Sequence, residues 1–505
     1  LAGHLGLGRL IVLYDDNKIS IDGSTDLAFT ENVAARFDSY GWHTITVQNG
    51  DSDYEGIYNA IQEAQKVTDK PTLISVKTTI GLGSIKEGTE KTHGSPLGEE
   101  DLANVKKKFG LNPSEKFAVA EDVAKTYSDL KEVGLQKEQA WNSLFAQYEE
   151  KYSDEAAEIK RRFSGSLPDG WKDDLPTYKA GDAALATRKC SQQCLEKLIP
   201  KIPEMIGGSA DLAPSNLTLV GEFVDLQKGQ YHGRNIRFGV REHAMASFVN
   251  GISAYGGFLP YCATFMNFLS YLQGAITLSD LSNVKCIYIM THDSIGLGED
   301  GPTHQPIEKL ATLRAMPNTI LFRPADGNEV AGSYICALEQ NSSPVVLALS
   351  RQNLPQLAGS SRDGVSKGAY TVLDCEGKAD VILAASGSEV SLCVAAAEGD
   401  LKGKNVRVVS VPSFELFEAQ DKEYKLSVFP DGVPVLSVEA ASTLGWQKFA
   451  HASIGMTTGG ASAKAGDLFK KFGFTSENVA AKAMQLVDFY AGNPPRSCVN
   501  TIVFQ

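Results

Sequence analysis

The sequence has no hydrophobic run long enough to cross a bilayer. Its longest apolar stretches, such as residues 10–14 and 345–349, have the length of buried strands, whereas a membrane span needs about 18 apolar residues or more. Lysine and arginine form no cluster, and the formal net charge is -13. These absences exclude a membrane-spanning protein and argue against nucleic acid or an anionic membrane as the main partner.

The cysteines are few and have no spacing typical of metal or redox sites. The 505 residues contain eight cysteines, all between Cys190 and Cys498, with no CxxC pair. This usage is typical of reduced thiols inside a cell, so secretion is not expected. Cys190 and Cys194 lie one helical turn apart, and packing in a core explains them more simply than redox chemistry does.

Short β-rich runs alternate with segments of helical spacing along most of the chain. This alternation predicts an α/β protein whose parallel sheets are covered by helices on both faces. The length exceeds what one core fills, so several domains are expected. The expected strands are residues 10–14, 44–47, 73–76, 205–207, 236–240, 286–290, 320–323, 345–349, 381–385, 406–411 and 435–438.

Composition divides the chain into four parts. A charged, helix-favouring segment follows about residue 106, and prolines at 168 and 176 mark the boundary after it. Because the chain opens on Leu1 without methionine or a targeting segment, we expect a preceding segment to be missing. The expected parts are a first domain with its helical connector at 1–150, α/β domains at 175–362 and 363–492, and a loose tail at 493–505.

Oxygen-bearing side chains follow the first expected strand. Asp15, Asp16 and Asn17 stand at its carboxyl end, where open α/β sheets bind ligands. The Asn17 amide and the Ile19 carbonyl suit a hard cation such as Mg²⁺ or Ca²⁺. Turn formation after a strand is the alternative.

Two further polar segments have both a functional and a structural interpretation. In GGSADLAPSNLT, small hydroxyl and amide groups beside Asp211 suit a phosphate. Capping of a helix or turn chemistry by Ser215 is the structural alternative. In GSIKEGTEKTHGSPLG, His93 is a lone loop histidine whose meaning depends on the other motifs.

The segment IRFGVREHAMASFVNGI places Glu242 in the first turn of an expected helix. One interpretation is a favourable interaction of its carboxylate with the helix dipole. The other is a carboxyl group held at an interface to exchange a proton with a heterocycle nitrogen, which requires burial and a tuned pKa.

The densest group of titratable side chains lies in THDSIGLGEDGPTHQPIEKL, residues 291–310. Folding alone does not require so many of them in one glycine-rich loop, so we predict a functional site there. We expect the following helix to begin at Pro306, because proline is favoured at the first helical position. The titratable residues before Pro306 are His292, Asp293, Glu299, Asp300 and His304.

Aromatic residues at 265, 268 and 271 recur every three positions and form either an aromatic wall or part of a core. Arg351 follows an expected strand and either clamps a phosphate or pairs with an acid.

The third domain shows no dense polar cluster. Its Ser386, Gly387 and Ser388 either cap a helix or bind an anion at the start of one.

Five motifs, taken together and at these intervals, resemble the transketolase family, and of a eukaryotic type: DDNKISIDG, KTHGSPLG, GGSADLAPSNLT, FGVREHAM and GEDGPTHQPIE. The resemblance runs from Leu1 to about residue 492. It implies an enzyme that uses thiamine diphosphate with Mg²⁺ or Ca²⁺ and reversibly moves a two-carbon ketol unit between sugar phosphates. The donor would be a ketose phosphate such as xylulose 5-phosphate, and the acceptor an aldose phosphate such as ribose 5-phosphate or erythrose 4-phosphate.

The family serves the pentose phosphate pathway and the Calvin cycle, so cytoplasm and chloroplast stroma are the expected locations. The resemblance also implies a homodimer with active sites at the interface. It assigns catalytic roles to Glu242, His304 and His93, and metal binding to Asn17 and Ile19. The implied cofactor-binding residues are Asn17, Ile19, His93, Asp211, Glu242, Phe265, Phe268 and Tyr271. The implied substrate-binding residues are Arg188, Ser215, His292, Asp300, His304 and Arg351.

One departure from the family pattern concerns the diphosphate. The chain contains no Gly-Asp-Gly segment, which in the family supplies half of the diphosphate pocket and a metal-binding aspartate. The metal shell is therefore incomplete, and an inactive, dimerising fragment is one alternative. A dihydroxyacetone synthase-like or other thiamine-diphosphate enzyme is the other.

Overall fold

The computed structural model describes residues 1–221 and 223–499. Its contacts divide the chain into two compact units. Leu1–Ser153 with Leu226–His232 form the first unit, and the other described residues, from Asp154 onward, form the second.

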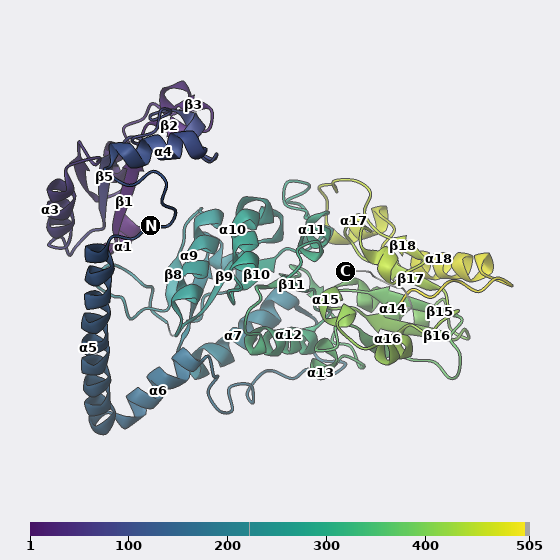
Figure 1. The fold of residues 1–505 in the computed structure, drawn as a ribbon. Helices are drawn as coiled ribbons and strands as arrows, with labels where there is room; N and C mark the ends of the chain where they lie inside the picture. Colours follow the sequence, from purple (N-terminus) through teal and green to yellow (C-terminus); the bar gives the residue numbers. More distant parts are fainter. Residues whose placement is uncertain (222, 500–505) are drawn as a thin grey trace. The chain divides into compact units, whose positions relative to one another are not determined.

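The first unit contains a parallel three-stranded sheet in the order β1-β5-β4. Residues Ala60 and Ala64 of α3 are buried against Ile74 and Val76 of β5, which accounts for the helical spacing of small and apolar residues there. The long helix α5 buries none of its residues and appears in Figure 1 as one unbroken rod. The elements are α1 (Ala2–Leu5), β1 (Ile11–Asp16), β2 (Ile19–Ser20), β3 (Gly23–Ser24), α2 (Val33–Ser39), β4 (His43–Val47), α3 (Tyr54–Ala64), β5 (Thr72–Lys77), α4 (Glu99–Lys108) and α5 (Glu121–Lys151).

The second unit begins at Asp154, within α6, and contains a six-stranded, wholly parallel sheet in the order β11-β12-β10-β9-β7-β8. Strands β10 and β12 are buried along their whole length, as expected for a sheet with both faces covered. The elements are α6 (Ser153–Ser164), β6 (Leu185–Ala186), α7 (Thr187–Lys201), β7 (Met205–Ser209), α8 (Ala213–Asn216), β8 (Asn235–Arg237), α9 (Glu242–Tyr255), β9 (Leu259–Phe265), α10 (Leu269–Leu281), β10 (Ile287–Thr291), α11 (Lys309–Arg314), β11 (Ile320–Phe322), α12 (Gly327–Glu339), β12 (Val345–Leu349), β13 (Asn353–Leu354) and α13 (Arg362–Val365).

A five-stranded sheet follows, in the order β14-β16-β15-β17-β18, with only the edge strand β14 antiparallel. Alternate residues of β15 enter different cores: Val381, Leu383 and Ala385 one, and Ile382 and Ala384 the other. Both faces of this sheet are therefore covered. The elements are β14 (Tyr370–Leu373), β15 (Val381–Ala385), α14 (Glu389–Glu398), β16 (Val406–Ser410), α15 (Phe414–Glu418), α16 (Lys422–Val428), β17 (Val435–Val438), β18 (Ala452–Ile454), α17 (Ala465–Lys471) and α18 (Ser476–Phe489).

The α/β class with parallel, helix-flanked sheets is confirmed, and a strand lies at every expected position. Three local predictions need correction. The strand expected at 236–240 ends at Arg237, because Gly239 takes a left-handed φ of 68°. The helix expected at Pro306 begins at Lys309, after a turn in which the Ile307 N–H donates to the Gln305 carbonyl. Strand β9, at the centre of the six-stranded sheet, was not predicted.

The predicted tail lies partly outside the described residues, at 500–505. Residues 493–499 contain no helix or strand. Cys498 contacts His451, with Sγ 3.3 Å from Nε2.

Candidate active site

The carboxyl edge of the six-stranded sheet gathers most of the predicted site residues. Strands β12, β10, β9 and β7 are neighbours in this sheet, and ligands bind beyond the carboxyl ends of such strands. Arg351 follows β12, His292 follows β10, and Phe265 ends β9. Ser215 lies in α8, just after β7. Ser215 is therefore inside a one-turn helix and does not cap it, and its N–H donates to the Leu212 carbonyl (2.9 Å), which is the turn chemistry of the structural alternative.

Two arginines that form no ion pair with an acidic side chain among residues 1–221 and 223–499 meet at this edge. The Arg188 N–H donates to the Ser350 carbonyl (3.4 Å), which brings Arg188 beside Arg351. Arg188 Nη1 donates to the Ser215 carbonyl (2.5 Å), but its Nε is buried without a partner. Burial, followed by the nearby Arg351 charge, lowers the pKa of Arg188. Two cations without a counter-charge, together with a buried N–H without a partner, in the part of the chain that the structure describes form a site suited to an anion.

His292 faces the same cations as a neutral ring. Burial first, and then the charges of Arg188, Arg351 and His304, lower its pKa to about 3. The Thr291 hydroxyl donates to Asn216 Oδ1 (2.7 Å), so it accepts from His292 Nδ1–H (2.8 Å). Nε2 is then the free acceptor of His292, suited to a substrate hydroxyl.

This shifted pKa predicts a stability effect. Below an ordinary pKa of 6.5 the unfolded chain protonates His292, whereas the folded chain keeps it neutral down to about pH 3. Stability from this residue is therefore lost as the pH falls through this window. We expect the loss between pH 7 and pH 5 to be smaller by about 2 kcal/mol in His292→Asn, because asparagine does not titrate and tolerates the left-handed φ of 63°. Urea unfolding at both pH values measures the difference, and equal losses would contradict it.

An aromatic wall borders these groups. The rings of Phe265 and Phe268 stack with centroids 5.8 Å apart, and Tyr271 follows at 5.9 Å. The His292 ring lies 3.8 Å from Phe265, and the His304 ring 5.6 Å from Phe268. A cavity of about 320 Å³ opens beside this wall, lined in part by Phe268 and Tyr271. Tyr271 is 64% exposed, so the wall presents ring surface that a planar ligand can cover.

Glu242 begins α9, as predicted, and α9 packs against α10, whose first turn carries Tyr271. The Glu242 carboxylate is partly buried and makes no hydrogen bond with the described residues. Asp300 and Asp211 are exposed, and Asp211 takes a left-handed φ of 60°. A free carboxylate at the end of a helix can accept a proton from a ligand.

The remaining predicted residues lie in the first unit. Asn17 Oδ1 accepts from the Ile19 N–H (3.0 Å), which is the turn bond of the structural alternative, and His93 is exposed. Asp16 is paired with Lys77 and Lys18. Residues 1–221 and 223–499 contain no group of three His, Cys, Asp or Glu able to hold a metal ion. Asn17 and Ile19 offer two oxygens where Mg²⁺ needs about six, so these residues alone do not fit the metal.

Family models match three successive parts of the chain. They describe the thiamine diphosphate binding domain of transketolase at residues 1–168, its pyrimidine binding domain at 183–356, and a transketolase-like C-terminal domain at 368–475. The transketolase of Scheffersomyces stipitis is 53% identical over 500 residues, which are 97% of this chain and 74% of that protein. The chain belongs to the transketolase family. It is accordingly a ketol-transferring enzyme whose cofactor is thiamine diphosphate.

Other transketolases give the same picture. The chloroplastic transketolase of Zea mays is 52% identical over 96% of this chain and 73% of that protein. A crystal structure of the Pichia stipitis transketolase with sedoheptulose 7-phosphate superposes with a TM-score of 0.97 at 52% identity, covering 99% of this chain and 75% of that one. The chain spans about three quarters of the length of these transketolases. Among the described residues, no helix is long and apolar enough to span a membrane.

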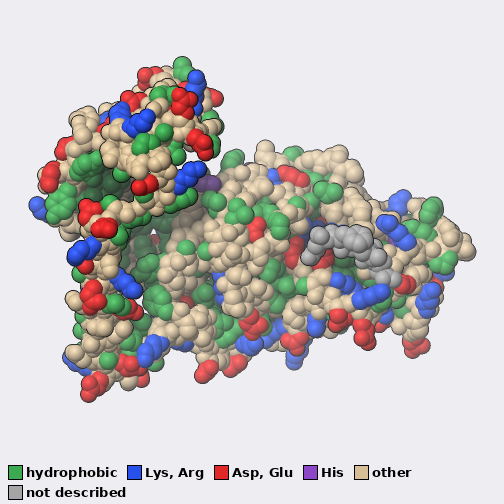
Figure 2. Space-filling view, viewed as in Figure 1, with side chains coloured by type: hydrophobic (Ala, Val, Ile, Leu, Met, Phe, Trp, Pro, Cys, Tyr) green, Lys and Arg blue, Asp and Glu red, His purple; other side chains and the backbone are tan. Residues whose placement is uncertain are grey.

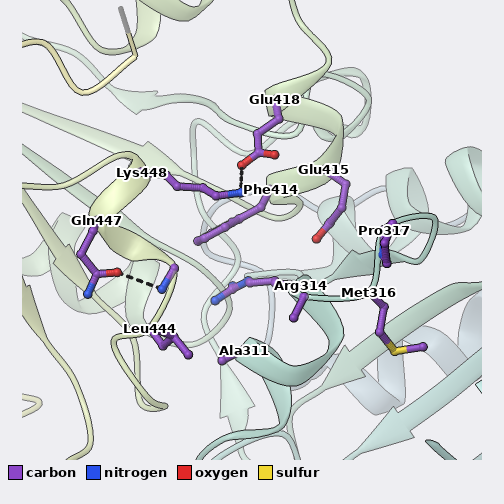
Figure 3. Close-up of a pocket in the computed structure, with 12 residues that line it drawn as sticks. Ala311, Arg314, Met316, Pro317, Phe414, Glu415, Glu418, Leu444, Gln447 and Lys448 are labelled. Atoms are coloured by element: carbon purple, nitrogen blue, oxygen red, sulfur yellow. Dashed lines mark hydrogen bonds and ion pairs between the residues drawn. The ribbon is translucent and has the colours of Figure 1, made fainter. Parts of the chain in front are cut away.

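A larger cavity, of about 650 Å³, lies elsewhere in this transketolase-family chain. Arg314, Phe414 and Leu444 line it, and an ion pair joins Lys448 to Glu418 at its wall (Figure 3). None of the predicted site residues lines it. Size alone therefore does not mark the active site here.

The sequence did not reveal a buried polar network behind the larger cavity. Ser386 donates to Glu439, and Ser388 to Glu389 (2.5 Å). Ser388 precedes α14 without a capping bond. The two serine hydroxyls therefore bond to buried carboxylates and, contrary to both predictions, neither cap α14 nor face an anion. The third domain does hold a dense polar cluster.

Proposed function

We propose that this chain transfers a two-carbon ketol unit from a ketose phosphate such as xylulose 5-phosphate to an aldose phosphate such as ribose 5-phosphate or erythrose 4-phosphate. The observation that carries the proposal is the pair Arg188 and Arg351, two cations with no acidic partner among the described residues, beside the neutral His292. A sugar phosphate supplies the missing anion and also hydroxyls for His292 and His304. Solved structures of the Pichia stipitis transketolase contain xylulose 5-phosphate and fructose 6-phosphate, which supports this substrate class.

The pyrimidine side of thiamine diphosphate fits the residues present. When bound, the cofactor supplies a carbon nucleophile for the ketose carbonyl. Phe265, Phe268 and Tyr271 cover its planar ring, and Glu242 holds a proton at a ring nitrogen. His304 contacts the hydroxyls of the donor. The phosphate of the donor is bound by Arg188, Ser215 and Arg351. His93, Asp211 and Asp300 retain their proposed roles toward cofactor or substrate.

For the metal, we propose that Asn17 and Ile19 give two ligands to Mg²⁺ or Ca²⁺ and that a Gly-Asp-Gly segment outside the 505 residues completes the shell. Calorimetry with Mg²⁺ and thiamine diphosphate tests this. We expect weak binding to the chain alone and stronger binding when a transketolase segment carrying Gly-Asp-Gly precedes Leu1. Equal binding in both would contradict the proposed ligand set.

The proposed assembly is a homodimer with the active sites at its interface. Large apolar side chains that are more than half exposed occur along α9 and α10: Tyr255, Tyr271, Leu278 and Leu281. Such surfaces mark protein interfaces.

Acidic and basic side chains are intermingled over the face shown in Figure 2, and we propose no nucleic acid or membrane partner. The proposed location is the cytoplasm or the chloroplast stroma, since relatives include chloroplastic transketolases.

The deciding assay offers xylulose 5-phosphate with either ribose 5-phosphate or formaldehyde as acceptor. We expect ketol transfer to ribose 5-phosphate to be much faster. A preference for formaldehyde would instead indicate a dihydroxyacetone synthase. Transfer to neither, with the Gly-Asp-Gly segment supplied, would contradict the proposed function.

A further inference from the structure

The loop that carries His292, Asp300 and His304 is held from the C-terminal part of the chain. We call residues 292–308 the substrate loop. Four hydrogen bonds join it to residues beyond 440 through the loop backbone or the Gln305 amide, which makes two of them, and an ion pair joins it to Arg323. The backbone and Gln305 bonds are Ser442 N–H to the Ile307 carbonyl (2.8 Å), Ser462 Oγ to the Glu299 carbonyl, and the Gln305 amide with Ala461.

Gln305 is the tightest of these attachments. Its side chain is 2% exposed and directly follows His304 in the chain. Nε2 donates to the Ala461 carbonyl (2.8 Å), and Oε1 accepts from the Ala461 N–H (2.9 Å). The amide thus binds one backbone residue at both ends, as a strand partner does, and fixes the end of the substrate loop.

Arg323 fixes the start of the substrate loop. It is fully buried, and its Nε donates to Asp293 Oδ2 (2.8 Å), next to His292. Its Nη1 donates to the Ser386 carbonyl (2.8 Å) and to Glu389 (2.5 Å). His292 itself has a left-handed φ of 63°, a conformation that persists in a non-glycine residue only when its surroundings impose it.

We propose that the C-terminal domain acts in ketol transfer by holding the substrate loop, with Gln305 and Arg323 as positioning residues. This inference rests on the proposed function of His292 and His304. Arg188 and Arg351 lie outside the loop. The C-terminal contacts therefore set the geometry of the reacting groups and do not affect the binding of the substrate phosphate by these arginines. The inference gives the C-terminal domain a role that its own sequence pattern does not indicate.

Gly460→Ala tests the proposed role of Gln305 by changing the C-terminal segment that the Gln305 amide contacts. Gly460 has a φ of +90°, and a Cβ there would lie 1.8 Å from Gln305 Oε1, so the Gln305 amide must leave Ala461. We expect kcat to fall by about 10- to 100-fold, because small displacements of reacting groups have effects of this size. The KM for xylulose 5-phosphate should change by less than about threefold, since its phosphate contacts remain. Amide hydrogen exchange of residues 292–308 should become faster.

Gly403→Ala is the matched control for backbone strain. Gly403 has a φ of +92° and open space around its Cβ position, so alanine there strains the chain without touching the loop. If Gly460→Ala matches Gly403→Ala in kcat and in loop exchange, the inference is wrong.

Ser462→Ala removes only the hydroxyl bonded to the Glu299 carbonyl and should give a smaller effect in the same direction. It is the variant to use if Gly460→Ala does not fold, and unchanged loop exchange in it would then overturn the inference. Exchange is measured without substrate. A wild-type chain without ketol transfer would therefore refute the proposed function while the exchange comparison still decides whether the loop is held.

Discussion

Glu242→Gln is expected to reduce kcat by about 1,000-fold or more, in the upper part of the range for loss of a positioned acid–base group. The glutamine side chain keeps the size of Glu242 and its place at the start of α9. It removes the ionised oxygen that holds a proton at the cofactor ring, an interaction that strengthens as charge develops during the reaction. Initial rates of ketol transfer at saturating thiamine diphosphate, with the Gly-Asp-Gly segment supplied, measure the effect.

The fold should survive this substitution, because Glu242 makes no hydrogen bond with the described residues. Its melting temperature should match that of the wild-type chain within about 2 °C. Glu196→Gln is a matched control, since Glu196 is an exposed glutamate in α7, away from the site. A Glu242→Gln protein with wild-type turnover would contradict the proposed role of Glu242 in holding a proton at the cofactor ring.

Arg351→Ala should raise the KM for fructose 6-phosphate by about 10- to 100-fold, the usual range for one charge-assisted hydrogen bond to a phosphate. The same variant should leave the low activity with unphosphorylated fructose almost unchanged, because fructose has no anion to lose. Arg351 makes no ion pair with the described residues, so its removal strands no buried carboxylate. The ratio of kcat/KM for the two sugars is the measurement.

Arg351→Lys is the graded control for the phosphate contact. Lysine keeps the charge and loses the two-pronged geometry of the guanidinium, so its KM should fall between wild type and Arg351→Ala. Equal losses with fructose and fructose 6-phosphate in Arg351→Ala would place Arg351 away from the phosphate.

The architecture was predictable because hydrophobic spacing encodes it directly. Fully apolar runs such as 345–349 became the buried parallel strand β12, and Glu242 fell in the first turn of α9 as its spacing required. Strand β9 was missed because Pro260 is its second residue, and proline usually argues against a central strand. The helix start at Pro306 failed because backbone bonds from Ser442 and within the turn take precedence over the local preference for proline.

The motifs predicted many of the site residues, but they did not predict the residues that position the substrate loop. His292 and His304 stood out as part of a dense titratable loop, and the structure places their rings against Phe265 and Phe268. Gln305 and Arg323 gave no such signal. Their partners Ala461 and Glu389 lie 156 and 66 residues away in sequence, and no local pattern records so distant a contact.

A mixed-subunit experiment tests most directly the proposal that the active sites lie at a homodimer interface, from which it follows that one copy supplies Asn17 and the other Glu242. The variants Asn17→Ala and Glu242→Gln, each expected to be inactive alone, are unfolded and refolded together in equal amounts. If the sites are shared, each mixed dimer has one doubly altered site and one intact site. Random pairing should then restore about a quarter of the wild-type activity. Recovery of none, with mixed dimers demonstrated by mass, would show that Asn17 and Glu242 serve the same site within one chain and would contradict the account.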